Sequence, residues 1–243
     1  MVRFSIITCV KNNEIDIGRC LQSVDALIYD DYEHIILDGN SVDQTLKVVH
    51  QHASIRSRIF SQHDTGLYNA LNAALKLAKG QYIILLHADD TFMSPSILTE
   101  LEKCLVDENF PDAVLCNITI TDKTGKLIRK WNAKTFEWAK IKYGWCPPHT
   151  GLVIGRNVYD ENLPYSEDFL ISSDYDFIVR LLTKQLRYTF FEKNLVNMRI
   201  GGMSTSIKNY RKTLVEDMRI ANLHELSFIA PFLKRIFKIG QFF

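Results

Sequence analysis

Two adjacent acidic residues, Asp89 and Asp90, follow an apolar run in the stretch IILLHADDTF, which covers residues 83–92. The run at 83–86 is typical of a buried strand, so both carboxylates are expected at its carboxyl end. Carboxylate oxygens bind hard cations such as Mg²⁺ or Mn²⁺, which proteins usually hold through one or two such groups together with substrate phosphates. The dipeptide by itself, however, favours a solvated turn before a helix that starts near Ser94, because an acid stabilises a helix N-terminus.

Another acid, Asp38, takes the same position in the stretch IILDGNSVDQT. A predicted strand at 33–38 ends at this residue, and a turn and a helix start follow it. Ser41 and Gln44 have the spacing of a capping box, which predicts a structural role for them. Asp38 precedes the cap, so its carboxylate can accept hydrogen bonds from a nucleobase imide or a ribose hydroxyl.

A third polar cluster opens the stretch HDTGLYNALNAALKLAKG. Asp64 and Gly66 stand in front of an amphipathic helix whose apolar stripe is predicted to be core. Asn69 and Asn72 lie about one turn apart in that helix, although asparagine is a poor former of helix interiors. This favours a recognition role for the two amides on the exposed face.

The elements that must position these residues alternate between apolar runs and helical patterns. Such alternation indicates an α/β fold, with a mostly parallel sheet flanked by helices. Ligands bind outside the carboxyl ends of the strands in such a sheet, so the polar clusters are expected to meet on one rim. Strands are predicted at 3–10, 33–38, 58–61, 81–87, 112–120, 150–156 and 188–198, and helices at about 17–24, 67–78, 174–185 and 207–225.

Composition narrows the functional class. The 243 residues carry a formal charge of +1, from 29 basic and 28 acidic residues, so no overall field favours nucleic acid. The five cysteines are scattered and odd in number, which argues against a disulfide framework or a zinc site and predicts reduced thiols in the cytoplasm. No stretch approaches the roughly 18 apolar residues of a membrane-spanning helix.

Taken in order, these motifs resemble those of the family-two glycosyltransferases, which are inverting enzymes with a GT-A fold that use nucleotide sugars. The first strand of that family ends in a stretch similar to TCVKNN at 8–13. The family motif D-G-x-S-x-D-x-T resembles DGNSVDQT at 38–45, and D-x-G-x-Y-x-A-x-N resembles DTGLYNALN at 64–72. The acidic motif resembles HADD at 87–90. The resemblance extends over roughly residues 2–205.

This resemblance implies roles for the residues on the rim. Asp38 would contact the nucleobase, usually uracil. Asp89 would approach the ribose or the metal, and Asp90 would ligate Mg²⁺ or Mn²⁺. In one departure from the family, His87 stands where Asp or Asn is common, which bears on the geometry and metal preference of the site. The implied nucleotide-sugar site consists of Thr8, Val10, Asn12, Asp38, Asp64, Asn72 and Asp89.

The second half contains a further match, SEDFLISSDYDFIVRL at 166–181. It resembles the acceptor-side stretch of the family, in which an acid at the start of a helix is the catalytic base. Asp174 and Asp176 compete for this role, but residues two apart on a helix do not share a face, and Ser173 with Asp176 fits a capping box. Asp174 is therefore the predicted base and Asp176 a structural cap. Glu167 and Asp168 are predicted to be solvated loop acids.

Relatives also place acceptor or diphosphate contacts in the stretches PPHTG and GGMST. A lone histidine is more often structural than catalytic, and a plain turn explains the paired glycines nearly as well as a phosphate contact does. The candidates in these two stretches are His149, Gly202 and Ser204.

Two segments follow no motif. Residues 120–148 are polar, basic and aromatic with little periodicity, and we expect a mobile segment that closes over donor and acceptor. In the tail at 226–243, apolar residues share one helix face and basic residues the other, which fits an interfacial helix on an anionic membrane. A C-terminal helix docked on the domain or on a partner chain fits equally well. One domain is expected at 1–225, with a donor half at 1–120 and an acceptor half at 121–225.

The sequence therefore predicts a metal-dependent inverting glycosyltransferase that moves one sugar from a nucleotide sugar, usually a UDP-sugar, to a hydroxyl of its acceptor. A saccharide or a polyprenyl-diphosphate-linked saccharide is the expected acceptor, in surface-polysaccharide synthesis at the inner face of the cytoplasmic membrane. A non-catalytic nucleotide-sugar-binding or scaffold subunit is an alternative that His87 favours. A sugar-phosphate nucleotidyltransferase ranks lower, because TCVKNNE lacks the glycine-rich loop that such enzymes need.

Overall fold

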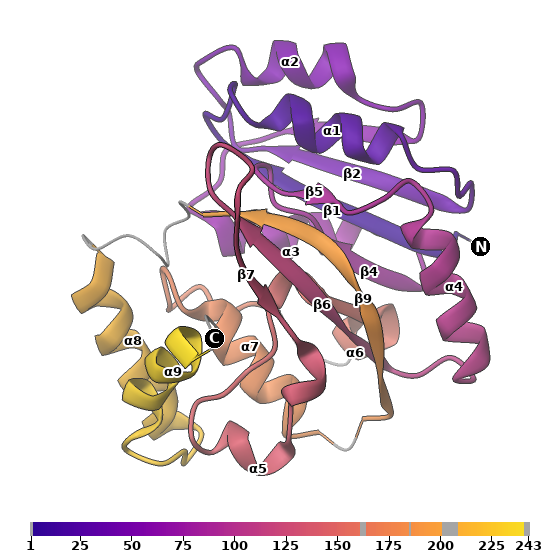
Figure 1. The fold of residues 1–243 in the computed structure, drawn as a ribbon. Coiled ribbons are helices and arrows are strands. Elements are labelled where there is room, and N and C mark those ends of the chain that lie inside the picture. Colours follow the sequence, from indigo (N-terminus) through magenta and orange to yellow (C-terminus); the bar gives the residue numbers. More distant parts are fainter. Residues whose placement is uncertain (1, 161–163, 185, 201–208, 241–243) are drawn as a thin grey trace.

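The computed structural model of the chain describes residues 2–160, 164–184, 186–200 and 209–240. Within them lies one mixed sheet with the strand order β3-β2-β1-β4-β8-β6-β9-β5, to which β7 is added by pairing with β6 (Figure 1). Strands from both predicted halves of the chain share this sheet. The strands are β1 (Phe4–Val10), β2 (Tyr32–Asp38), β3 (Ser57–Ser61), β4 (Tyr82–Leu85), β5 (Thr91–Phe92), β6 (Ala113–Thr121), β7 (Leu127–Trp131), β8 (Leu152–Gly155) and β9 (Tyr188–Arg199).

The four strands β3, β2, β1 and β4 are parallel, and their carboxyl ends meet at one rim. Alternate side chains of β1 enter different apolar layers, since Ile6 packs with one core cluster and Ile7 with the other. The first layer contains α1 (Ile17–Asp25) and α4 (Ile97–Asp107), and the second contains α3 (Leu67–Leu77). Helices therefore cover both faces, which explains why every residue of β2 is buried.

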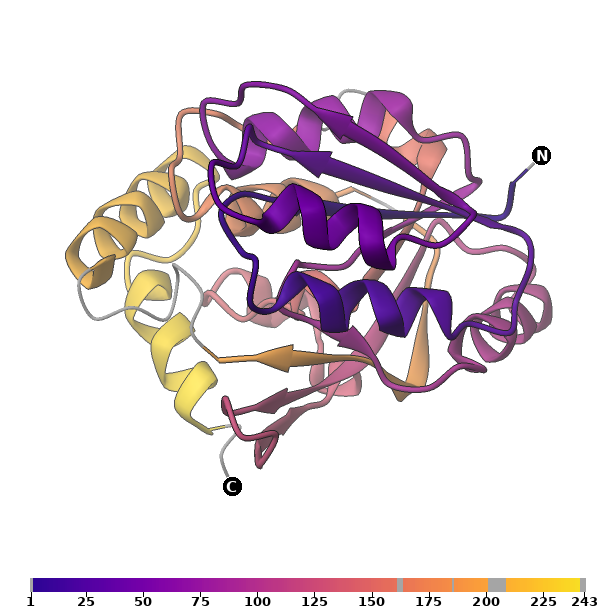
Figure 2. The same ribbon diagram turned by 90° about the horizontal axis from the view of Figure 1, so that it is seen from above.

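The remaining strands extend this sheet. β8 pairs antiparallel with β4 and β6, whereas β9 runs parallel to β6. Figure 2 shows the C-terminal helices gathered at one end of the molecule, beyond the rim of the parallel strands. The helices and turns not yet given are α2 (Thr45–His52), η1 (Ala133–Thr135), α5 (Trp138–Ile141), η2 (His149–Gly151), α6 (Arg156–Asp160), α7 (Ser173–Leu182), α8 (Tyr210–Leu223) and α9 (Ala230–Gly240).

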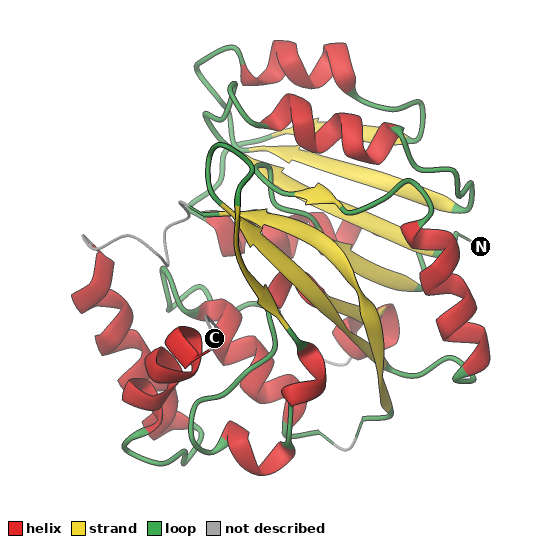
Figure 3. Ribbon diagram, viewed as in Figure 1, coloured by secondary structure: helices red, strands yellow, loops and turns green. Residues whose placement is uncertain are grey.

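The structure confirms the predicted strands and most of the predicted helices to within a few residues (Figure 3). The capping box at 41–44 is wrong, because α2 begins at Thr45 and Ser41 Oγ accepts a hydrogen bond from the Asn12 N–H instead. The segment 120–148, expected to lack regular structure, contains β7, η1 and α5. Its aromatic side chains Trp131, Phe136 and Trp145 are buried, so they serve as core. The five cysteines form no disulfide with one another in this structure.

Of the two arrangements expected for the tail, the structure shows the helix docked on the domain. Lys234 of α9 is buried and forms an ion pair with Asp217 of α8, and Arg235 contacts the same carboxylate. These two cations face the domain, so they are not presented to a membrane surface. Phe228, just before α9, is 86% exposed. None of the helices in the described ranges combines the length and apolarity that crossing a membrane requires.

Candidate functional site

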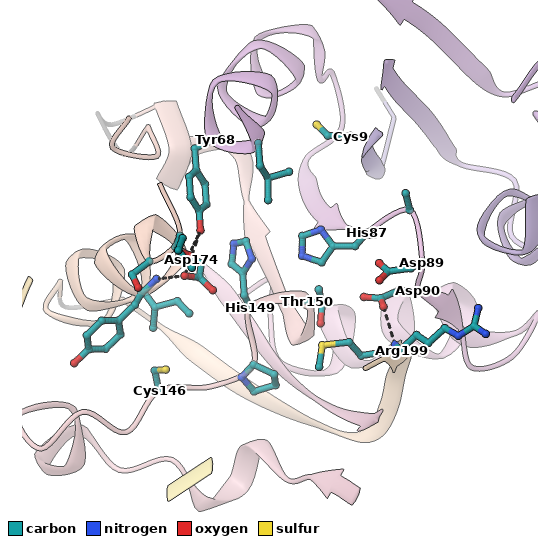
Figure 4. A pocket seen from close by; sticks show the side chains of 18 of the residues that line it. Cys9, Tyr68, His87, Asp89, Asp90, Cys146, His149, Thr150, Asp174 and Arg199 are labelled. Atoms are coloured by element: carbon teal, nitrogen blue, oxygen red, sulfur yellow. Dashed lines mark hydrogen bonds between the residues drawn. The ribbon is translucent and has the colours of Figure 1, made fainter. Parts of the chain in front are cut away.

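A pocket with a volume of about 370 Å³ opens beyond the carboxyl ends of β1 and β4. It is bounded on the other side by η2, the start of α7 and a residue of α9. Figure 4 shows Asp174 at one end of this pocket and Asp89 with Asp90 at the other, with His149 and His87 between them. The charged and histidine side chains that line it are Lys11, His87, Asp89, Asp90, Arg129, His149, Asp174, Arg199 and Lys234.

The acidic end is formed by the turn that follows β4. Asp90 is only 1% exposed, and its Oδ1 accepts a hydrogen bond of 3.1 Å from the Arg199 N–H at the end of β9. Its Oδ2 is buried without a hydrogen-bond partner among the described residues. Burial, and to a smaller extent the charge of Asp89, raises the pKa of the Asp90 carboxyl well above its ordinary value. The ionised form of Asp90 is therefore strongly disfavoured relative to the protonated form unless a cation compensates its charge.

The acidic end is chemically suited to a divalent cation. Asp90 Oδ2 offers a buried oxygen without a partner, and Asp89 lines the same pocket. The described residues contain no group of three or more His, Cys, Asp or Glu side chains that would enclose a metal alone. Mg²⁺ and Mn²⁺ sites of this open kind use one or two carboxylates and complete the shell with water and substrate phosphates.

Two half-buried imidazoles line the middle of the pocket. The rings of His87 and His149 lie 6.1 Å apart, and His149 Nε2 is 2.8 Å from the hydroxyl of Tyr165. Burial lowers the pKa of His149 to about 4 and also lowers the pKa of His87, although Asp89 and Asp174 oppose the shift at His87. Both rings are therefore neutral at pH 7, and each offers one N–H donor and one nitrogen acceptor.

The opposite end of the pocket contains Asp174, which sits in the first turn of α7. Its Oδ1 accepts a hydrogen bond of 2.8 Å from the Tyr175 N–H. The Tyr68 hydroxyl lies 3.5 Å from the same oxygen and donates more closely, at 2.6 Å, to the Ile171 carbonyl. This half-buried carboxylate faces the pocket, so it can take a proton from a bound hydroxyl.

Asp176, predicted to cap α7, has a different structural role. Its carboxylate accepts hydrogen bonds of 2.8 Å from Arg180 Nε and from His224 Nε2. Ser172, and not Ser173, is the N-cap residue of α7, and it makes no side-chain capping bond. Asp176 is therefore a buried link between α7 and the end of α8, outside the pocket.

The expected nucleobase contacts flank the pocket. Asp38 is fully buried, and its Oδ2 accepts a hydrogen bond of 2.7 Å from Ser61 Oγ and one from the Ser41 N–H. Thr8 Oγ1 is 3.0 Å from His34 Nε2 in the core of the sheet. Asn12 Oδ1 accepts a bond of 2.9 Å from the Val42 N–H. Val10 is the member of the predicted uracil pocket that lines the cavity.

Two other predicted binding residues have clear structural contacts. Asp64 lies 3.3 Å from Lys11 Nζ and directly against Gly39, where a Cβ atom would meet its Oδ2 at 1.9 Å. The amide of Asn72 makes two hydrogen bonds of 2.8 Å with the backbone of Tyr165, so it is not on a free face. Neither Asp64 nor Asn72 lines the pocket.

The remaining predicted site residues lie either outside the described residues or away from the pocket. Gly202 and Ser204 lie outside the described residues. Glu167 is exposed and accepts hydrogen bonds from Asn69 and Asn72. Sequence reasoning missed several lining residues that come from distant segments, although Tyr68 and Tyr175 lie inside recognised motifs. These missed residues are Tyr68, Arg129, Trp131, Tyr175, Arg199 and Lys234.

Comparison with known sequences identifies the family of the chain. The sequence profile of Glycosyl transferase family 2 matches residues 5–159, which is more than half of the chain. A PGL/p-HBAD biosynthesis glycosyltransferase of Mycobacterium bovis is 26% identical over 224 residues, covering 89% of this chain and 86% of the relative. Chondroitin synthase of Escherichia coli is 29% identical over 79% of this chain and 28% of its own length.

Solved structures share the fold. A structure of S. aureus TarS, residues 1–349, in complex with UDP-GlcNAc superimposes with a TM-score of 0.74 at 20% identity, covering 98% of this chain and 73% of that one. The mannosyltransferase PcManGT from Pyrobaculum calidifontis, in complex with GDP-Man and Mn²⁺, gives a TM-score of 0.63 at 16% identity over 89% and 64% of the two chains. The expected GT-A architecture is thereby confirmed.

Proposed function

Because the chain belongs to glycosyl transferase family 2, we propose that it transfers a single sugar from a nucleotide sugar to a hydroxyl of an acceptor, with inversion at the anomeric carbon. The observation that carries this proposal is the separation of two functional ends within one pocket: Asp89 and Asp90 at one end and Asp174 at the other. Direct displacement needs such an arrangement, because the leaving group and the attacking hydroxyl lie on opposite sides of the reacting carbon.

Asp174 is the proposed general base. It lies on the pocket wall, and the Tyr175 N–H orients the carboxylate by donating a hydrogen bond to Oδ1. Its Oδ2 accepts no hydrogen bond from the described residues. A base that removes the proton as the hydroxyl attacks contributes about 10²–10⁴-fold to the rate. The inverting outcome follows from a single displacement of this kind.

Asp90, assisted by Asp89, is the proposed holder of Mg²⁺ or Mn²⁺. When bound, such a cation neutralises charge that develops on a diphosphate leaving group. Asp90 itself contributes the buried Oδ2, and the Arg199 N–H fixes the orientation of the carboxylate through Oδ1. The Mn²⁺ reported with the archaeal mannosyltransferase supports the class of ion.

The neutral imidazoles between the two ends are proposed to contact the transferred sugar. His87 and His149 are half-buried, lie on the pocket wall and have lowered pKa values. A neutral imidazole can donate to one sugar hydroxyl and accept from another, without attracting the acidic groups around it. We propose UDP as the nucleotide, with Asp38, Thr8, Val10 and Asn12 around the uracil end; UDP-GlcNAc in TarS supports this class.

The acceptor is proposed to be a saccharide or a polyprenyl-diphosphate-linked saccharide used in surface-polysaccharide synthesis. Exposed apolar side chains on the C-terminal helices and the turn between them, including Leu223, Phe228 and Phe232, support a peripheral membrane contact. This contact would involve the aromatic side of the tail, since Lys234 and Arg235 face the domain.

A thermal-shift panel tests the donor assignment. The purified chain is heated with UDP, GDP, dTDP or CMP, each with and without Mn²⁺. A ligand at a hundredfold excess over its Kd adds about 2.7 kcal/mol of stability by mass action. We expect stabilisation by UDP that depends on Mn²⁺ and is lost in Asp90→Ala. Absence of stabilisation by every nucleotide would refute the proposal.

A non-catalytic nucleotide-sugar-binding subunit is the second candidate, because His87 stands where Asp or Asn is common at the start of the acidic motif. Release of UDP from UDP-GlcNAc by wild-type protein distinguishes the two candidates. Metal-dependent UDP binding without any release under all acceptor conditions would favour the binding subunit.

A further inference from the structure

Lys234 is a buried cation that the proposed reaction does not use. It lies on α9, is only 7% exposed and lines the pocket that contains Asp174. Its Nζ donates a hydrogen bond of 2.7 Å to Asp217 Oδ1 and sits 3.7 Å from the centre of the Tyr175 ring. Burial of a lysine is costly unless its charge is compensated. The position of Lys234 on a pocket wall therefore suggests a role in binding.

Attachment of α9 to the domain does not by itself require this lysine. Asp217 also accepts a hydrogen bond of 3.3 Å from Arg235 Nη1, so one carboxylate faces two cations. Arg235 is not among the residues that line the pocket, whereas Lys234 is. An ammonium has three N–H donors, and within the described part of the chain one of them is bonded to Asp217. The Lys234 side of this cluster therefore presents excess positive charge to the cavity.

Lys234 lies on the base side of the pocket. Tyr175, over which its ammonium is placed, directly follows Asp174, and Asp174 is separated from Asp89 and Asp90 by the two histidines (Figure 4). A donor diphosphate belongs with the acidic pair at the opposite end. An anion at Lys234 would consequently belong to the molecule whose hydroxyl Asp174 activates.

Two further wall residues have unsatisfied polar atoms. The indole Nε1 of Trp131 and the Oγ1 of Thr150 are buried without a hydrogen-bond partner in the described chain, and both residues line this pocket. Buried polar groups are nearly always paired in native proteins, which points to a ligand or water that supplies the partners. An indole N–H and a hydroxyl are suited to the hydroxyl groups of a carbohydrate.

We propose that the Asp174 end of the pocket selects an acceptor saccharide that carries an anionic substituent, a phosphate or a carboxylate, and that Lys234 is the residue that recognises this anion. The inference rests on the proposed function, because it assigns the acceptor to this end. Lys234 acts on acceptor selection, and donor binding does not depend on it.

The test measures binding of three probes to protein saturated with UDP and Mn²⁺. Glucose 6-phosphate, glucuronate and glucose are titrated in a calorimeter against wild type, Lys234→Met and Arg235→Met. Arg235→Met removes the other cation from the same Asp217 and so provides the matched control. We expect at least one anionic sugar to bind wild type about tenfold tighter than glucose, which is the usual contribution of a hydrogen bond to a charged group. The preference should disappear in Lys234→Met and persist in Arg235→Met.

Several results would overturn the proposal. Equal affinities for glucose and for both anions in wild type would remove the anion preference, and this comparison needs no substituted protein. A preference that survives in Lys234→Met, or is lost equally in Arg235→Met, would reject Lys234 as the recognising residue. Release of UDP from UDP-GlcNAc by the same wild-type protein would show that the proposed function stands even if this inference fails. Tighter binding of glucose 6-phosphate than of glucuronate would identify phosphate as the group.

Discussion

The two ends of the pocket are built in different ways. At the donor end, the acids follow parallel strands whose register is set by backbone hydrogen bonds: Ile7 of β1 lies between Ile35 of β2 and Leu85 of β4. At the acceptor end, contacts between distant side chains fix the wall. Tyr68 reaches the Ile171 carbonyl and Lys234 reaches Asp217.

Because of this difference, substitutions at the donor end should change activity alone, whereas some substitutions at the acceptor end should also change stability. Backbone pairing holds the donor end even when a side chain is changed, so a carboxylate there can be replaced without moving its neighbours. The acceptor end depends on the side chains themselves, so some substitutions there should cost stability as well as activity.

Asp90→Asn should have the largest effect on activity. The amide keeps the shape of the side chain and its bond from the Arg199 N–H, but it removes the charge needed to hold a divalent cation. We expect release of UDP from UDP-GlcNAc to fall by about a thousandfold or more, since a metal contributes several kcal/mol to such a step. Asp107→Asn, an exposed acid at the end of α4, serves as the charge-matched control. Equal activity in wild type and Asp90→Asn would disprove the metal assignment.

Asp174→Asn should have the next largest effect. Loss of the base should lower the rate of transfer by about a hundredfold or more while leaving the KM for the donor nearly unchanged. Steady-state kinetics with UDP-GlcNAc and an acceptor measures both quantities. If Asp174→Asn turned over at the wild-type rate, the base would have to be another residue.

Asn72→Ala should affect stability and leave nucleotide binding intact. The substitution removes two hydrogen bonds to the Tyr165 backbone, and the buried Tyr165 N–H loses its acceptor. The free energy of unfolding should fall by about 2 kcal/mol as a result. Urea denaturation and UDP titration are compared with Asn222→Ala, whose side chain is exposed. A specific loss of UDP affinity would instead place Asn72 in the donor site, as its motif implies.

His34→Gln should have the smallest effect on activity at neutral pH, but it should clearly change how the free energy of unfolding depends on pH in acid. Burial lowers the folded-state pKa of His34 to about 3, so on acidification through 6.5 the unfolded chain takes up a proton that the folded chain does not. Wild type should lose about 1.4 kcal/mol per pH unit from this group between pH 6 and pH 4. Removing the imidazole should reduce the slope of unfolding free energy against pH by that amount. Identical slopes would contradict the burial-shifted titration.

The sequence was most informative where a chemically distinctive residue directly follows a predicted strand. Asp38 and Asp90 could be placed at strand ends because apolar runs reveal strands and the sheet brings their ends together. Position in a motif did not reveal side-chain partners, so Asn72 was assigned to an exposed face although it binds the Tyr165 backbone. Lys234 gave a helix pattern but no sign of Asp217, because an ion pair between helices depends on how the helices pack.

Titration of UDP into wild type, Asp90→Asn and Asp174→Asn in the presence of Mn²⁺ tests the two-ended pocket most directly. We expect metal-dependent binding to wild type and to Asp174→Asn with similar Kd, and binding at least tenfold weaker to Asp90→Asn. Equal weakening in both variants would contradict the assignment of donor and base to separate ends of the pocket.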